Sequence, residues 1–456
     1  MNIAFILTLA TLLAAGLLGL LFYLRPGWGL GLFIFSLPFE RIGSYALNPA
    51  TGYPLIHPAQ IIGAGLIGGL VLRLLARRTQ LVLPKSLWFL LAFLGSAFIS
   101  ANLVRVQEVW EIFVWLIFIT LLFVTIATLV AKLDKRIVRK ALVITALLVS
   151  IFGLYQLVGD LVGLPTQATG LRVRYTKEGL GFTRIQGPAL EPLYYANYLF
   201  LPLFVLLALQ VETGFDNKLE GVTTVLVFLN FVLTLSRGAY ASGVVGLVVL
   251  MVLLRKRFFG WAKKRGPLIA GLILGAVILV LAATTLSVSI AKKGQFSAPT
   301  VLKNFLVTKV FETGSFTERV RDQKLALKIF HEHPVFGVGI GGFGAAYYGC
   351  KIGKCVYRPN NQALEVLAEG GVVGFTTFHL FLLMLLIYGW RAFRQAEGEQ
   401  RAMLAGLLAA TVAMVVQSQT FSGFLCCLTY TWGTLGLLAG LSTTAKTTKV
   451  KGASSR

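Results

Sequence analysis

Arg237 is the only charged residue between positions 221 and 254. A charged side chain at the centre of a membrane span costs about 2.5–3.5 kcal/mol on insertion scales. The neighbours Ser236, Gly238 and Ala239 therefore predict a tight turn that places Arg237 at a membrane surface. Because the planar guanidinium matches phosphate oxygens with two parallel hydrogen bonds, this residue suggests phosphate binding. The alternative is an anchor whose charged end only reaches the lipid headgroups.

A second basic feature is the segment 292–360, which holds eleven Lys or Arg residues and four acidic ones. This excess indicates an anionic ligand, or attraction to anionic lipid headgroups. Ser315 and Glu318 have the spacing of a capping box and predict a helix that ends before Pro334. The glycines from 337 to 344 resemble a nucleotide-binding loop only weakly, because no strand precedes them.

Two further constellations in the same segment could do chemistry. His331 and His333 could bind a metal ion, but the sequence offers no obvious third ligand. Cys350 and Cys355 could form a disulfide if the segment lies in an oxidising compartment. No Ser/His/Asp or Cys/His arrangement suggests a nucleophilic enzyme.

The elements that position these residues are membrane spans. Hydrophobic residues make up 56% of the chain and charged residues 13%, a balance that cannot form the surface of a soluble protein of 456 residues. A bilayer core is crossed by about 20 helical residues. Apolar runs that fit twelve or thirteen spans lie at 1–24, 26–39, 58–72, 86–104, 112–131, 141–159, 192–211, 221–236, 238–254, 266–291, 370–390 and, as two spans with a polar break at 417–423, 402–445. The predicted fold is an all-α integral membrane protein, with 1–456 as a single polytopic domain.

The net charge of +24 follows the orientation of these spans, so no nucleic-acid partner is needed to explain it. If each run crosses once, the basic loops at 73–85, 132–140 and 255–265 and the C-terminal tail share one side, which is cytoplasmic by the positive-inside rule. Two longer loops, 160–191 and 292–360, then lie on the extracytoplasmic side. The second is expected to contain short helices, and it exceeds the length to which the rule applies.

Several motifs, in their order along the chain, resemble the O-antigen ligase and O-antigen polymerase superfamily. They are Arg184-Ile185-Gln186-Gly187 ahead of Ala196-Asn197-Tyr198-Leu199, the Ser236-Arg237-Gly238-Ala239 turn, Thr317-Glu318-Arg319, His333-Pro334-Val335-Phe336-Gly337-Val338-Gly339, and Asn360-Asn361-Gln362-Ala363-Leu364 with Gly371 and Gly374. The resemblance extends from about 183 to 374, with a large outer loop between late spans.

This resemblance implies a GT-C-like membrane glycosyltransferase of the bacterial cytoplasmic (inner) membrane, acting at its outer face. The donor would be a glycan linked to undecaprenyl pyrophosphate, and the acceptor a sugar on a lipid A core, a glycan chain or a glycoprotein. By analogy, Arg237 and Arg319 would hold the pyrophosphate and Arg184 would line the same site. Guanidinium groups in a low-dielectric site could stabilise the leaving pyrophosphate without a metal ion or other cofactor.

The sequence departs from the family at Asn360, where the ligases have a histidine thought to activate the acceptor hydroxyl. An amide cannot take up a proton near neutral pH, so Asn360 and Asn361 would orient the acceptor, or another group is the base. Glu365 and Glu369 are the nearest candidates in sequence. They could instead pair with arginines of the loop or cap the helix start.

Two other classes of protein stay open. A transporter would be expected to show internal repeats and paired broken helices, and the sequence shows neither. A catalytically inactive glycan-binding protein would fit the missing histidine, but such a relative should have lost its arginines too. Arg184, Arg237 and Arg319 are all present.

Overall fold

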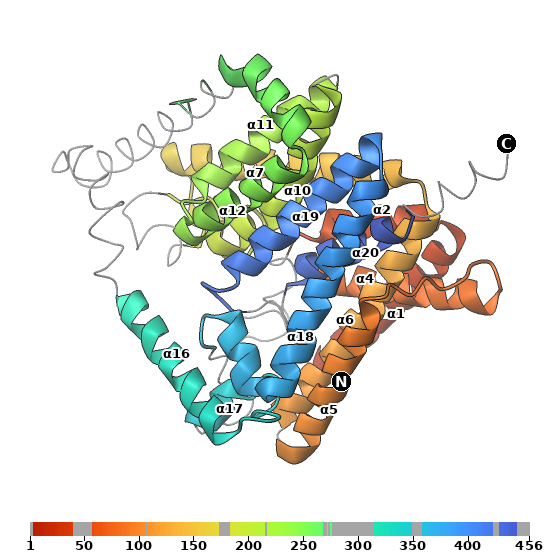
Figure 1. Ribbon diagram of the computed structural model, residues 1–456, viewed down its shortest axis with the longest axis vertical. Helices are drawn as coiled ribbons and strands as arrows, with labels where there is room; N and C mark the ends of the chain where they lie inside the picture. Colours follow the sequence, from red (N-terminus) through yellow and green to blue (C-terminus); the bar gives the residue numbers. More distant parts are fainter. Residues whose placement is uncertain are drawn as a thin grey trace.

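A computed structural model describes residues 3–39, 57–104, 107–172, 183–214, 217–267, 271, 274–275, 314–348, 358–422 and 428–444. Helices form nearly all of this part of the chain (Figure 1). They are α1 (Ile3–Leu24), α2 (Pro26–Ser36), α4 (Pro58–Leu75), α5 (Leu87–Val104), α6 (Gln107–Lys132), α7 (Lys135–Leu161), α8 (Thr166–Thr169), α10 (Pro192–Thr213), α11 (Lys218–Leu233), α12 (Arg237–Leu253), α16 (Gly314–Glu332), α17 (Phe343–Tyr348), α18 (Gln362–Gln395), α19 (Gly398–Gln417) and α20 (Thr429–Thr444).

The helices confirm an all-α integral membrane protein. Within the described residues, seven are long and apolar enough to cross a bilayer, or up to eight if one bent pair counts as a span. The predicted number of spans is larger because several apolar runs form shorter helices, such as α2 with 11 residues and α11 and α20 with 16 each. Most of the predicted span at 266–291 lies outside the described residues.

The bundle is organised around α10, which packs against α7, α11, α12 and α19. Small residues let these helices approach closely, as is usual between membrane helices. A Cβ atom at Gly406 of α19 would lie 2.5 Å from the Cα of Val205, and one at Gly246 of α12 would lie 2.5 Å from the ring of Phe204. The centre of the bundle therefore forms a rigid support for the loops at its ends.

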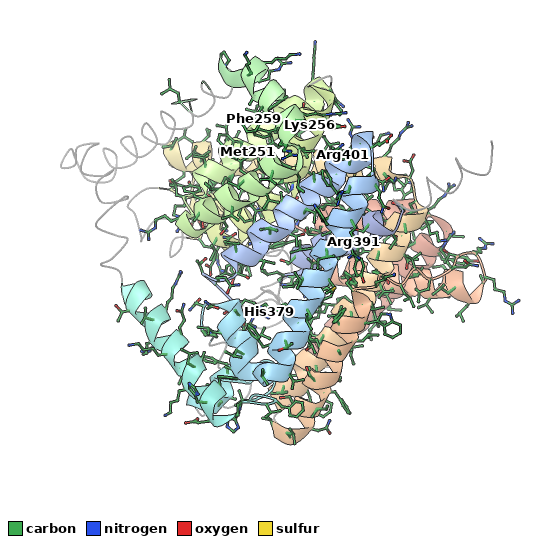
Figure 2. The ribbon with its side chains drawn as sticks, viewed as in Figure 1. Met251, Lys256, Phe259, His379, Arg391 and Arg401 are labelled. Carbon is green, nitrogen blue, oxygen red and sulfur yellow. The ribbon has the colours of Figure 1, made fainter. Side chains whose placement is uncertain are left out.

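One end of the bundle collects the basic segments. Arg139, near the start of α7, forms ion pairs with Glu220 at the start of α11 (2.7 Å) and with Glu399 at the start of α19 (3.1 Å). Figure 2 shows Lys256 and Arg401 toward the same end. Arg73, Arg77 and Arg78 line a cleft with Lys132. Most of these basic residues come from segments that the sequence analysis assigned to one side of the membrane.

The prediction of a basic loop at 255–265 was wrong. These residues form a helix, Arg255–Pro267, which meets α12 at a bend of 111°. Phe258 packs on Trp261 within it, with ring centroids 5.7 Å apart. A helix with both basic and aromatic residues is suited to lie along a membrane surface, whereas a loop was expected from its charge alone.

At the opposite end of the bundle, α18 is interrupted by a break. The glycine-rich turn that follows α16 packs against this break. Gly371 has φ 60° and ψ −165°, so the helix is interrupted there. This turn, which precedes α17, forms hydrogen bonds with backbone groups on both sides of the break. Val372 donates its N–H to the Pro334 carbonyl (2.8 Å), and Val338 donates to the Ala368 carbonyl (3.2 Å). In Figure 1, α16 and α17 accordingly lie beside the first part of α18.

Candidate active site

Arg184 lies in a segment held against the end of α11. Its Nε donates to the carbonyl of Thr234 (3.0 Å), and the N–H of Ile185 donates to the carbonyl of Leu233 (3.3 Å). Gln156, fully buried in α7, fixes the same segment because its Oε1 accepts the N–H of Gly187 (2.8 Å). Gln156 was not predicted from the sequence, although a polar residue inside the apolar run 141–159 was a signal for it.

Arg237 is the first residue of α12 and follows a tight turn, as predicted. Leu235 has a positive φ of 50°, which reverses the chain between α11 and α12. Ser236 is the N-cap residue, and its side chain makes no capping hydrogen bond. A Cβ atom at Gly238 would lie 2.8 Å from Oγ1 of Thr420, so the turn lies against the segment between α19 and α20.

Arg319 reaches the same segment from α16. Its Nη1 donates to the carbonyl oxygen of Thr420 (3.1 Å). Thr420 therefore contacts the Arg237 turn on one side and the Arg319 guanidinium on the other. Thr420 was not predicted from the sequence, where the polar break at 417–423 was the signal for it.

The three arginines are close enough to interact electrostatically. Burial lowers the pKa of the Arg184 guanidinium, and the charge of Arg237 lowers it further. Burial and Arg237 likewise lower the pKa of Arg319. Glu191 acts on both arginines in the opposite direction. Guanidinium groups stay protonated in proteins, so the structure holds three cations together in a partly desolvated site, an arrangement suited to a multivalent anion.

The beginning of α18 meets the same 418–420 segment. The N–H of Gln362 donates to the carbonyl of Ser418 (2.9 Å). Asn361 is the N-cap residue of α18, and its Oδ1 accepts the N–H of Leu364 (3.0 Å). Asn360 has a positive φ of 52°, which an asparagine tolerates better than most residues. Asn360 and Asn361 therefore lie next to the 418–420 segment, which also contacts the Arg237 turn and the Arg319 guanidinium.

Glu365 and Glu369 are buried and contact other groups. Glu365 lies 3.5 Å from a guanidinium nitrogen of Arg358. The two carboxylate oxygens of Glu369 accept the N–H groups of Gly341 (2.8 Å) and Phe343 (3.2 Å). Both carboxylates therefore have structural partners, Glu365 in the segment just before α18 and Glu369 in the glycine-rich turn.

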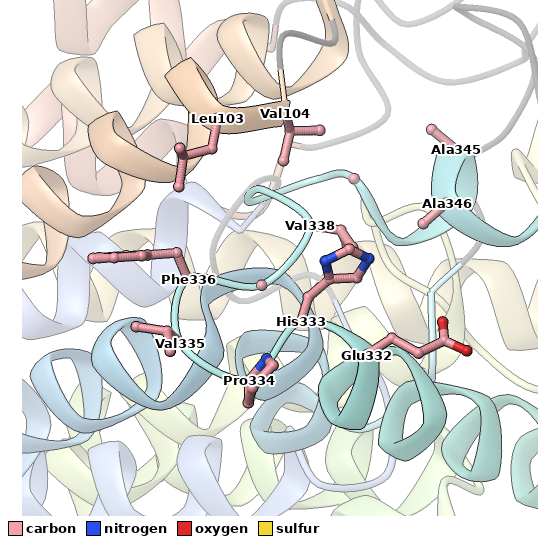
Figure 3. A pocket seen from close by; sticks show the side chains of 12 residues that line it. Leu103, Val104, Glu332, His333, Pro334, Val335, Phe336, Val338, Ala345 and Ala346 are labelled. Carbon is pink, nitrogen blue, oxygen red and sulfur yellow. The ribbon is translucent and has the colours of Figure 1, made fainter.

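His333 lines a separate cleft of about 580 Å³ between the end of α5 and the turn after α16 (Figure 3). Arg319 and His333 are 14 residues apart, about 20 Å along a helix. His333 thus lies well away from Arg319. Among the described residues, no three His, Cys, Asp or Glu side chains are placed to hold a metal ion. Cys350 and Cys355 lie outside the described residues.

Comparison with known proteins agrees with the motifs. A family model described as O-antigen ligase matches residues 222–379, a range that includes Arg237, Arg319 and the first half of α18. Arg184 precedes the matched range. No curated protein matches the chain. Residues 222–379 are therefore similar to the O-antigen ligase family, and the rest of the chain lies outside the matched range.

Proposed function

We propose that the protein transfers a glycan from undecaprenyl pyrophosphate to a sugar hydroxyl at the outer face of the bacterial cytoplasmic membrane. The observation that carries this proposal is the convergence of Arg184, Arg237 and Arg319. They come from three chain segments, and the last two meet at Thr420. A pyrophosphate ester supplies the multivalent anion that such a site favours.

The hydrogen bonds of the arginines suit this task. A guanidinium carries five N–H groups. Arg184 directs its Nε–H to the Thr234 carbonyl, and Arg319 directs one Nη1–H to the Thr420 carbonyl. The backbone therefore orients each guanidinium and leaves further N–H groups for phosphate oxygens. Fixed donors of this kind stabilise the charge that develops on a departing pyrophosphate, so the arginines can do the work of a metal ion.

The acceptor would approach from the beginning of α18. Asn360 and Asn361 would orient its hydroxyl at the end of the loop 292–360, and Glu365 and Glu369 would complete this side of the site from the first turns of α18. The acceptor sugar would belong to a lipid A core, a growing glycan or a glycoprotein. The assay therefore needs one acceptor substrate from each of these three classes.

The orientation in the membrane follows from the two ends of the bundle. The positive-inside rule would place the end with Arg73, Arg139 and Lys256, together with the C-terminus, in the cytoplasm. The arginine site would then face outward, where lipid-linked glycans are displayed after export.

The test is release of undecaprenyl pyrophosphate by the protein reconstituted in liposomes. The donor is undecaprenyl-pyrophosphate-linked oligosaccharide, supplied with each acceptor in a buffer containing a metal chelator. Removal of one fixed charge-stabilising donor typically slows an enzyme about 10²–10³-fold, so we expect a loss of this size in Arg237→Ala.

Lys328→Ala is the matched control, because this side chain is 71% exposed on the same helix as Arg319. It should release product at the wild-type rate. Equal rates in Arg237→Ala and the wild type would contradict the proposed role of the arginines. A donor that binds but is never cleaved, with any acceptor, would favour a transporter or a glycan-binding protein.

A further inference from the structure

Glycan transfer requires a group that takes the proton of the acceptor hydroxyl, and the proposed function leaves this group unassigned. The amide of Asn360 cannot serve near neutral pH. Glu365 lies beside Arg358, and Glu369 accepts two backbone N–H groups of the glycine-rich turn. The arrangement therefore directs attention to carboxylates nearer to the arginines.

Glu191 immediately precedes α10, at the end of the loop that carries Arg184. It occupies the N-cap position with an extended backbone (φ −148°, ψ 158°), but its side chain makes no capping hydrogen bond. One turn later, the ring of Tyr194 packs edge-on against Phe421, with centroids 5.7 Å apart. Phe421 follows Thr420 directly, so the start of α10 lies next to the residue that receives Arg319.

The electrostatic neighbourhood of Glu191 agrees with this placement. Its negative charge acts on both Arg184 and Arg319, which belong to different parts of the chain. Of the carboxylates that the structure describes, it is the one acting on both of these guanidinium groups. The residue as a whole is half-buried, so a substrate that enters the arginine site can reach it.

We propose that the carboxylate of Glu191 is the general base of the glycosyl transfer, an inference that rests on the proposed function. The acceptor oxygen forms a bond to the anomeric carbon of the donor sugar. The bond from that carbon to the pyrophosphate oxygen breaks, and its electron pair leaves on undecaprenyl pyrophosphate, which the arginines hold. The acceptor proton passes to a carboxylate oxygen of Glu191 and from there to water.

The competing explanation is that Glu191 only holds the arginines in position, as a brace, without taking up a proton. The affinity for undecaprenyl pyrophosphate distinguishes these two roles. Glu191→Gln removes the base but keeps the size of the side chain. Loss of a general base typically lowers kcat about 10²–10⁴-fold. Binding of undecaprenyl pyrophosphate itself should be unchanged or tighter, because a negative charge next to an anion site has been removed. A brace, in contrast, would weaken that binding when lost.

The experiment measures kcat and the Kd for undecaprenyl pyrophosphate in liposomes for the wild type, Glu191→Gln and Glu191→Ala. Formate should restore part of kcat in Glu191→Ala, because a small carboxylate can replace a missing base but not a missing brace. Glu332→Gln is the matched control, since this side chain is 56% exposed on α16 and should keep wild-type values. Glu191→Asp, which retains a carboxylate, should keep more activity than Glu191→Gln.

Three results would overturn the inference. One is a wild-type kcat in Glu191→Gln. Another is loss of undecaprenyl pyrophosphate binding in parallel with activity, without formate rescue, which would make Glu191 a positioning residue. The third, no release by the wild type with any acceptor, would refute the proposed function and remove the inference with it, so the two failures can be told apart.

Discussion

Glu369 provides the sharpest test of how the glycine-rich turn is held. Its buried carboxylate accepts the N–H groups of Gly341 (2.8 Å) and Phe343 (3.2 Å), so one side chain of α18 fastens the segment that follows α16. Glu369→Gln keeps one carbonyl oxygen and loses the second acceptor. Glu369→Ala loses both and leaves two buried N–H groups without their partner.

The magnitude follows from the number of bonds lost. A buried N–H left without its acceptor costs about 1–3 kcal/mol, so Glu369→Gln should weaken the turn by about this amount. Glu369→Ala should cost about twice as much. Because 1.4 kcal/mol is a factor of ten, amide hydrogens in the turn should exchange about ten to a hundred times faster in Glu369→Gln. Other bonds, such as Val338 N–H to the Ala368 carbonyl, are not altered directly.

Hydrogen exchange measured by mass spectrometry on peptides covering 337–343 is the assay. Faster exchange should be confined to this turn and to the adjoining end of α16, while peptides from α10 keep wild-type protection. Glu332→Gln is the control for a charge removed nearby without loss of a buried bond. Wild-type protection of Gly341 and Phe343 in both Glu369 variants would refute the role assigned to this carboxylate.

Two further substitutions test the packing of the bundle and its response to pH. A Cβ atom at Gly153 would lie 2.0 Å from Oδ1 of Asn230, so Gly153→Ala should lower the melting temperature by several degrees. The control is Gly95→Ala, which should keep the wild-type melting temperature because a Cβ atom at Gly95 would have no atom within 4 Å. Equal melting temperatures for the two variants would contradict the close contact of α7 and α11. Burial raises the pKa of Asp322 above its ordinary 3.8 despite the opposing charge of Arg321, so the contribution of the protonated carboxyl to stability is complete below about pH 3.8 and is lost as the pH rises through the raised pKa. The melting temperature should therefore fall over this pH interval more steeply in the wild type than in Asp322→Asn. Identical slopes of melting temperature against pH in the two proteins would contradict this prediction.

Features that depend on neighbouring residues could be predicted from the sequence. The turn before Arg237 and the end of α16 before Pro334 both agree with the structure. Each is determined by a local constraint, the cost of a buried charge in the first case and the backbone geometry of proline in the second. Such constraints act over a few residues and can be read along the chain.

Features that depend on contacts between distant segments could not be predicted. The bond from Arg319 to the Thr420 carbonyl joins residues 101 positions apart, and no local pattern marks it. The break in α18 at Gly371 depends on carbonyl groups supplied by the turn at Pro334 and Val335. The helix at 255–267 was assigned to a loop because its charges were considered without the bend that directs it away from α12.

The placement of Thr420 links the two halves of the proposed reaction. Bringing three guanidinium groups together is unfavourable, since each is partly desolvated and near-neighbour like charges repel. The fold offsets this cost by fixing Arg184 to the carbonyl of Thr234, at the end of α11, and Arg319 to the carbonyl of Thr420, in the segment between α19 and α20. The start of α18 also binds the 418–420 segment, through the carbonyl of Ser418. A donor that draws the arginines together would therefore act on the same stretch of backbone that positions the acceptor side. Donor binding can therefore order both sides of the site without any large movement of the bundle.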